Sequence, residues 1–228
     1  MKHVHENIVR IKAVQSSLGE LRDKVVYVGG ATVSLYAQRE APEIRETKDV
    51  DILVEIATNW DYAAVEEQLR RLGYQNDLES KFIGRYVLSG LIVDLMATEE
   101  KILGFSNKWY KEGFHTAINH QIDDLVTVKI FDCPHFIGSK IEAFKNRGKG
   151  DGRFSSDFED IVFILENRPT VWEEMERTTS KLKKYLKQEF QAFAVNPYME
   201  EWIASHSNFY TAQSTSLILE SLTKYVGS

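Results

Sequence analysis

The pattern of hydrophobic and polar residues changes near residue 132, and it predicts two kinds of structure in one chain. Before that point, short apolar runs alternate with polar or glycine-containing turns, as in strands that are joined by helices and hairpins. After it, the remaining segments have a helical character. We therefore expect an α/β (α+β) core over residues 1–132, followed by a helical C-terminal part over residues 133–228 that packs on the core.

The individual elements follow from the same pattern. Strands are expected at residues 25–28, 50–56, 81–88, 91–97 and 125–131. Helices are expected at residues 5–20, 31–38, 61–72, 133–146, 158–165, 172–190 and 199–225. The dipeptide Ser89-Gly90 predicts a hairpin between the third and fourth strands. Asn59 or Asp61 is the candidate N-cap of the third helix, because short polar side chains satisfy free N–H groups there.

Two aspartates stand at the start of the second predicted strand, shortly after a double glycine. Residues i and i+2 of a strand point to the same face, so Asp49 and Asp51 are expected side by side. Neighbouring carboxylates repel each other unless a cation lies between them, and Mg²⁺ prefers carboxylate oxygens as ligands. Asp94 adds a third carboxylate inside a later apolar run. With the turn at Gly29-Gly30, which leads into a predicted helix, this pattern favours metal-assisted phosphoryl chemistry.

Each of these residues also has an interpretation without function. A double glycine before a helix is usually a tight turn, and an Asp-x-Asp pair can lie on a solvated strand edge. Asp94 alternates with Val93 and Leu95, so it can simply face solvent. The functional interpretation is favoured by the combination of the glycine turn with Asp49 and Asp51 at this spacing.

Composition and charge narrow the class of protein. Hydrophobic residues make up 43% of the 228 residues and charged residues 27%, which is typical of a globular protein. The net charge of −6 argues against broad wrapping on nucleic acid, although KLKKYLK at residues 181–187 forms a local basic face. A single cysteine, Cys133, excludes an internal disulfide and suits a reducing compartment. No apolar run approaches the roughly 20 residues of a membrane helix, so we expect a cytoplasmic protein with no membrane partner.

Two groups of segments resemble a known family. GGATVSL and RETKDVDILVE resemble the Gly-Gly and Arg-x-Ser/Thr-x-Asp-hydrophobic-Asp motifs of the DNA polymerase β-like nucleotidyltransferase superfamily, and within it the AbiEii-type nucleotidyltransferases. The matching residues are Gly29, Gly30, Arg45, Thr47, Asp49 and Asp51. The later SKIEAFKNRGKGDGRFSSDFEDIVFIL resembles the family's helical Lys and Arg, followed by a helix that opens Asp-x-x-Asp. Its matching residues are Lys140, Arg147, Asp157 and Asp160. The linker GKGDGRFSSD is longer than the family's short basic link.

The resemblance implies a mixed sheet flanked by helices, and a site for a nucleoside triphosphate with Mg²⁺ or Mn²⁺. Asp49 and Asp51 would hold the metal, and Asp94 would act as a third ligand or as the base for an acceptor hydroxyl. Lys140 would neutralise charge on the phosphates, and Asp157 would orient Lys140 or Arg147, or cap its own helix. The implied nucleotide contacts are Gly29, Gly30, Thr32, Ser34, Lys140 and Arg147.

Two functions of different classes follow. The first is a metal-dependent nucleotidyltransferase that moves a nucleoside monophosphate from a nucleoside triphosphate to an acceptor hydroxyl on a tRNA end, a protein or a small molecule. Because the resembling family includes toxin and phage-defence proteins, this hypothesis brings with it an antitoxin protein as a partner. The second is a catalytically silent, transferase-like binding module that serves as an antitoxin or scaffold subunit. Retention of all three aspartates favours the first.

Overall fold

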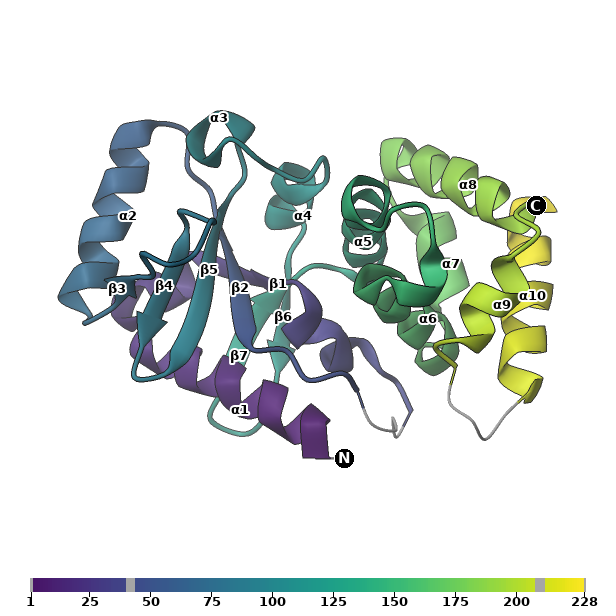
Figure 1. Cartoon of the computed structure of the whole chain (residues 1–228), viewed down its shortest axis with the longest axis horizontal. Helices are drawn as coiled ribbons and strands as arrows, with labels where there is room; N and C mark the ends of the chain where they lie inside the picture. The colour runs from purple at the N-terminus through teal and green to yellow at the C-terminus, as the bar shows by residue number, and fades with distance from the viewer. Residues whose placement is uncertain (1, 40–43, 208–211, 228) are drawn as a thin grey trace. The chain divides into compact units, whose positions relative to one another are not determined.

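The computed structural model describes residues 2–39, 44–207 and 212–227, and the chain divides into two compact units (Figure 1). The sheet unit comprises Met1–Leu35 and Glu43–Asp132, and the helical unit comprises Tyr36–Pro42 and Cys133–Ser228. The chain therefore enters the helical unit briefly before it returns to complete the sheet. In this excursion, Gln38 N–H donates to the carbonyl of Asn167, and Arg168 donates to the carbonyl of Tyr36.

The sheet unit is built on a mixed sheet with the strand order β3-β4-β5-β2-β1-β7-β6. Its strands are β1 Val25–Val28, β2 Asp49–Val54, β3 Gln75–Asn76, β4 Arg85–Leu88, β5 Leu91–Ala97, β6 Ile118–Gln121 and β7 Thr127–Ile130. The central strand β2 runs antiparallel to β1 and parallel to β5. All four residues of β1 are buried, as expected for an apolar run in the middle of a sheet.

Helices and short 3₁₀ turns surround this sheet. They are α1 Lys2–Ser17, η1 Gly19–Asp23, η2 Gly30–Tyr36, α2 Asn59–Arg71, α3 Glu100–Leu103 and α4 Tyr110–His115. Helix α1 contacts β2 and β5, and Figure 1 shows it running along one side of the sheet. Ile11 and Val14 of α1, and Leu18 directly after it, are fully buried, so the helical spacing in the sequence marks the face that packs on the strands.

Three predictions for the sheet unit need correction. The segment after the double glycine is a 3₁₀ helix rather than an α-helix, because the N–H and the hydroxyl of Thr32 both bond to the carbonyl of Gly29 and tighten the turn. The N-cap of α2 is Thr58, which forms a capping box with Asp61. The hairpin around Ser89 is confirmed, but β4 starts only at Arg85, because the preceding residues form turns.

The helical unit contains the remaining elements. They are α5 Cys133–Arg147, η3 Gly152–Phe154, α6 Ser156–Asn167, α7 Val171–Arg177, α8 Ser180–Ala194, α9 Met199–Ala204 and α10 Ala212–Gly227. The helix predicted at 172–190 is in fact two helices, because Thr179 leaves helical geometry and caps α8 through the N–H of Leu182. The helix predicted at 199–225 corresponds to α9 and α10, and part of it lies outside the described residues.

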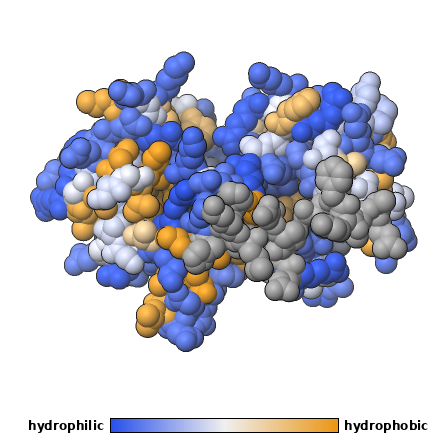
Figure 2. Space-filling model, turned by 60° about the horizontal axis from the view of Figure 1, so that its bottom comes forward, coloured by the Kyte–Doolittle hydropathy of each residue, from blue (hydrophilic) through white to orange (hydrophobic). Residues whose placement is uncertain are grey.

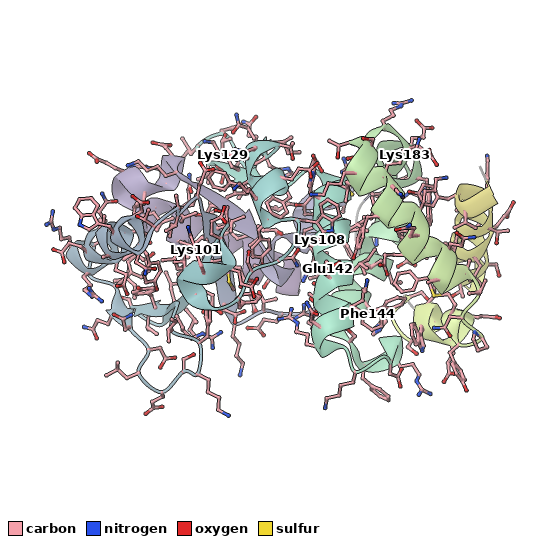
Figure 3. The ribbon with its side chains drawn as sticks, turned by 90° about the horizontal axis from the view of Figure 1, so that it is seen from above. Lys101, Lys108, Lys129, Glu142, Phe144 and Lys183 are labelled. Carbon is pink, nitrogen blue, oxygen red and sulfur yellow. The ribbon has the colours of Figure 1, made fainter. Side chains whose placement is uncertain are left out.

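Aromatic side chains make up much of the core of the helical unit. Phe144 of α5, labelled in Figure 3, packs against Phe158 of α6, with ring centroids 5.3 Å apart. Trp202 of α9 and Phe193 of α8 contact both rings. Offset and edge-on contacts of this kind add to the hydrophobic stabilisation of a core.

The hydrophilic character of the surface agrees with the 27% of charged residues in the sequence. The face in Figure 2 is mostly hydrophilic, with smaller apolar patches between. None of the helices in the described part of the chain combines the length and the apolar character needed to cross a bilayer.

Candidate active site

The first group of predicted site residues lies in one row on the sheet. Asp51 of β2 is in register with Asp94 of β5, and Asp94 is in register with Arg85 of β4. Residues in register on neighbouring strands point to the same face, and Asp49 shares that face because it lies two positions before Asp51. The structure therefore places Asp49, Asp51 and Asp94 on one face of the sheet; the i, i+2 spacing in the sequence indicates this for Asp49 and Asp51.

Arg85 joins this row and was not predicted from the sequence. Its Nε and Nη2 donate to the two carboxylate oxygens of Asp94, both at 2.7 Å, and Nη2 also donates to Asp49 Oδ2 at 2.7 Å. The signal was present in the hairpin: a two-residue turn at Ser89-Gly90 pairs Leu88 with Leu91, and counting outward pairs Arg85 with Asp94. We refer to Arg85, Asp49 and Asp94 as the Arg85 cluster.

Burial and the charge of Arg85 shift the pKa of Asp94 in opposite directions. The side chain of Asp94 is only 7% exposed, whereas that of Asp49 is 34% exposed. Burial raises the pKa of Asp94 above its ordinary value, and the bonds from Arg85 oppose that shift without cancelling it. The hydrogen bonds to Asp94 in turn raise the pKa of Arg85, so the guanidinium remains charged.

Asp51 lies directly against the glycine turn. Gly29 has a φ of +75°, in the left-handed region that favours glycine. A Cβ atom built at this position would lie 1.8 Å from Asp51 Oδ2 and 2.7 Å from its Cγ. The carboxylate of Asp51 therefore occupies the space that any larger residue at position 29 would fill, and this contact explains why a glycine precedes the Asp-x-Asp strand.

The hydroxyl residues of the turn have different surroundings. Thr32 is fully buried and its hydroxyl donates to the carbonyl of Gly29 at 2.9 Å, which closes the turn. Ser34 is partly buried, and its Oγ has no hydrogen-bond partner among the described residues. Gly30 is buried at the start of η2. The nucleotide contacts predicted for Gly30, Thr32 and Ser34 stay predictions.

Side chains of α1 form hydrogen bonds to the backbone of the segment that leads into β2. Asn7 donates from its side-chain amide to the carbonyl of Arg45, and its Oδ1 accepts from the N–H of Thr47 at 3.1 Å. Arg10 also donates to the carbonyl of Thr47 at 2.7 Å. These bonds fix the backbone immediately before Asp49, so the start of the Asp-x-Asp strand is anchored from outside the sheet.

The fit to a metal ion can be judged from these contacts. Mg²⁺ in phosphate-transfer sites commonly uses one or two protein carboxylates, with phosphate and water completing its coordination. Asp49 and Asp51, on one face and partly exposed, fit that pattern. Among the described residues, no three His, Cys, Asp or Glu side chains are arranged to hold a metal together. Both oxygens of Asp94 are bonded to Arg85, so the three-carboxylate set is not assembled here and stays a prediction.

The second group of predicted residues forms a separate network in the helical unit. Lys140 Nζ lies 3.2 Å from Asp157 Oδ1 and 2.5 Å from Asp160 Oδ2. Arg147 donates through Nε and Nη2 to the two oxygens of Asp157, at 2.7 and 2.8 Å. The Lys140 side chain is only 6% exposed. We refer to Lys140, Asp157 and Asp160 as the Lys140 cluster, which joins α5 to α6.

The surroundings of Lys140 and Asp157 shift the pKa of each in the direction that favours its charged form. Burial alone would raise the pKa of Asp157, but the Arg147 bonds and the charge of Lys140 hold it below its ordinary value. Burial likewise opposes the charge on Lys140, yet Asp160 and Asp157 raise its pKa. The structure thus places Lys140 in a saturated buried ion network, and its role toward a triphosphate stays a prediction.

A cavity of about 520 Å³ opens beside this network, within the helical unit. It is formed by the linker from α5 to α6, and its lining includes Arg147, Lys149, Asp151, Phe154, Ser156 and Asp157. The long linker noted in the sequence therefore builds a concave surface rather than a simple connection. Arg147, with a side chain 69% exposed, connects that surface to the buried Asp157.

Comparisons with known proteins give a structural likeness only. No family model matches the chain. No curated protein matches it either. Seven solved chains match, and one of them is an antigenic nucleotidyltransferase-like protein from Paracoccidioides brasiliensis. That match has 17% identity and a TM-score of 0.49, and covers 85% of this chain and 91% of the other.

Proposed function

We propose that this chain is a metal-dependent nucleotidyltransferase, which moves a nucleoside monophosphate from a nucleoside triphosphate to an acceptor hydroxyl. The observation that carries the proposal is the placement of Asp51 against the left-handed Gly29 turn, with Asp49 beside it on the same strand face. This arrangement puts two partly exposed carboxylates side by side on one strand face, where a divalent ion can bind both.

In this proposal, different residues bind the metal, bind the phosphates and support the strand that carries the carboxylates. Asp49 and Asp51 hold Mg²⁺ or Mn²⁺, and a divalent ion there would supply charge neutralisation for a triphosphate. The phosphates contact backbone N–H groups of the Gly29-Gly30 turn, and the buried Oγ of Ser34, which has no hydrogen-bond partner among the described residues, contributes a further contact when the substrate binds. The bonds from Asn7 and Arg10 keep the strand that carries the carboxylates in place, which reduces the reorganisation needed when the substrate binds.

The test is incubation of the purified protein with each labelled nucleoside triphosphate, Mg²⁺ or Mn²⁺, and separate pools of cellular RNA, protein and small molecules. We expect one pool to take the label from the wild-type protein, and Asp49→Asn and Asp51→Asn to abolish the transfer. Asp124→Asn is the matched control, because it removes the same charge from an exposed loop of the same unit. Full transfer by either site variant contradicts the proposal.

The finer parts of the proposal concern the acceptor and the biological role. A tRNA 3′ end, a protein and a small molecule each offer the hydroxyl that the reaction requires, and the pool that becomes labelled identifies the acceptor class. A role as an AbiEii-type toxin or phage-defence component, with an antitoxin partner, rests on the resemblance of the motifs alone. Growth arrest on expression of the wild-type chain, but not of Asp51→Asn, supports that role.

The Arg85 cluster favours a second candidate, a transferase-like binding module without catalysis. Arg85 occupies both oxygens of Asp94 and one oxygen of Asp49, as a counterion would in a protein that binds no metal. Thermal unfolding with each triphosphate and Mg²⁺ separates the two candidates, because a ligand that binds only the native state raises the melting temperature. An unchanged melting temperature with every triphosphate supports the binding module.

A further inference from the structure

The Arg85 cluster has a consequence for the metal site of the proposed function. Three carboxylates on one sheet face carry a charge of −3, and Arg85 reduces it to −2 from within the protein. A guanidinium is a fixed fork of donors and remains charged, so it competes with a divalent ion for the same oxygens. The structure shows which oxygens it takes: both of Asp94 and one of Asp49.

The two aspartates differ in how easily they can exchange that partner. Asp94 is bound at both oxygens in a bidentate pair and is 7% exposed, so loss of Arg85 would leave a buried charge without compensation. Asp49 is bound at one oxygen and is 34% exposed, so water or a cation can replace the guanidinium at little cost. Asp51 receives no bond from Arg85 and lies against Gly29.

We infer that Arg85 is a positioning residue that keeps Asp94 away from the divalent cation, so that Asp49 and Asp51 alone supply the protein's carboxylate ligands. This inference rests on the metal site of the proposed function, but not on catalysis. Asp94 then acts as an anchor that aims Arg85 at Asp49. Arg85 limits the affinity for free metal, and triphosphate oxygens complete the coordination that Asp94 does not provide.

The experiment measures Mn²⁺ binding to the protein alone, by calorimetry or by the paramagnetic signal of free Mn²⁺. Arg85→Gln changes the charge of the face from −2 to −3 and releases Asp94, so Mn²⁺ is expected to bind about tenfold more tightly, while the melting temperature falls. Arg85→Lys keeps the charge and is expected to bind Mn²⁺ with nearly wild-type affinity. A residue with a structural role only would lower the melting temperature without tightening the binding of the metal.

The double variant Arg85→Gln, Asp94→Asn provides the decisive control. It has the wild-type charge of −2 on the face but lacks the carboxylate of Asp94, and it leaves no unpaired charge in the buried position. We expect wild-type Mn²⁺ affinity. If Asp94 is a metal ligand, this variant instead binds Mn²⁺ at least roughly tenfold more weakly, and the inference is overturned.

The outcomes also separate this inference from the proposed function. A folded Arg85→Gln variant with unchanged or weaker Mn²⁺ binding overturns the inference, even if the wild-type protein transfers nucleotides. The expected order of affinities supports the inference, even if no acceptor is ever labelled. A wild-type protein that binds no Mn²⁺ removes the metal site and overturns both.

Discussion

Each unit of this molecule places a basic side chain between two aspartates, and the two arrangements differ in burial. In the Arg85 cluster, Asp49 and Arg85 remain about one-third and one-quarter exposed, at 34% and 27%. In the Lys140 cluster, no side chain is more than 6% exposed. A charge that reaches solvent can exchange partners, whereas a buried charge cannot leave its partner without a large desolvation cost.

This difference in burial gives the two clusters different capacities to exchange their partners. The Arg85 cluster is arranged across strands β4, β5 and β2, in the same row as Asp51, which lies against the left-handed Gly29 turn. The Lys140 cluster connects α5 and α6, the two helices that also contribute Phe144 and Phe158 to the aromatic core. Ion pairs of similar composition therefore serve different purposes, because the surroundings set the cost of breaking them.

The largest effect is expected from removal of the buried cation. Lys140→Met removes the buried cation that pairs with both Asp160 and Asp157, so we expect a loss of about 3–5 kcal/mol in the free energy of unfolding, measured in urea. Arg85→Gln, in the more exposed cluster, is expected to cost about 1–2 kcal/mol. If the two substitutions cost the same, burial is not what distinguishes the clusters.

A smaller effect is expected at the glycine turn, and a matched pair of glycines isolates its cause. Gly29→Ala and Gly90→Ala both place a side chain at positive φ, +75° and +85°, which costs about 1–2 kcal/mol. Only at Gly29 does the new Cβ meet the Asp51 carboxylate, since nothing lies within 4 Å at Gly90. We therefore expect only Gly29→Ala to weaken Mn²⁺ binding as well. Equal Mn²⁺ affinity in the two variants would contradict the role of the Asp51 contact.

The smallest effect is a difference in pH dependence between the clusters. The pKa of Asp157 is lowered on folding, so its stabilising contribution is complete above the ordinary aspartate pKa and is lost as pH falls through the depressed value. The pKa of Asp94 is raised, so folding favours its protonated form, and stability declines as pH rises from the ordinary value through the raised one. Carboxyl carbon titration by NMR, with Asp157→Asn and Asp94→Asn for assignment, should give shifts of opposite sign; shifts of the same sign contradict the comparison.

The basic helix face shows what a sequence pattern leaves open. KLKKYLK at residues 181–187 marks a local run of four lysines but does not say what they pair with. In the structure, Lys183 and Lys187 of α8 both pair with Glu176, and Lys187 also lies over the ring of Tyr225 (Figure 3 labels Lys183). Two of the four lysines thus share one carboxylate, on a residue that the one-dimensional pattern does not connect to them.

The sequence by itself determined the features that depend on local periodicity. Apolar runs placed β1 and β2, the turn at Ser89-Gly90 placed the β4–β5 hairpin, and the i, i+2 spacing placed Asp49 and Asp51 on one face. The helical character after residue 132 was also readable, because an amphipathic helix repeats its apolar face within a few residues. Helix ends were less accurate, since a single cap such as Thr58 or Thr179 decides them.

Only the tertiary structure decided which charges are neighbours. Asp51 meets Asp94 because β5 lies parallel to β2, a pairing between strands far apart in the chain. Arg85 could have been paired with Asp94 from the hairpin, but its reach to Asp49 depends on the order β4-β5-β2. The saturation of Lys140 depends on how α5 packs on α6. The physical reason is that a side chain's partners and burial are set by contacts distant in sequence, whereas periodicity records only which face it occupies.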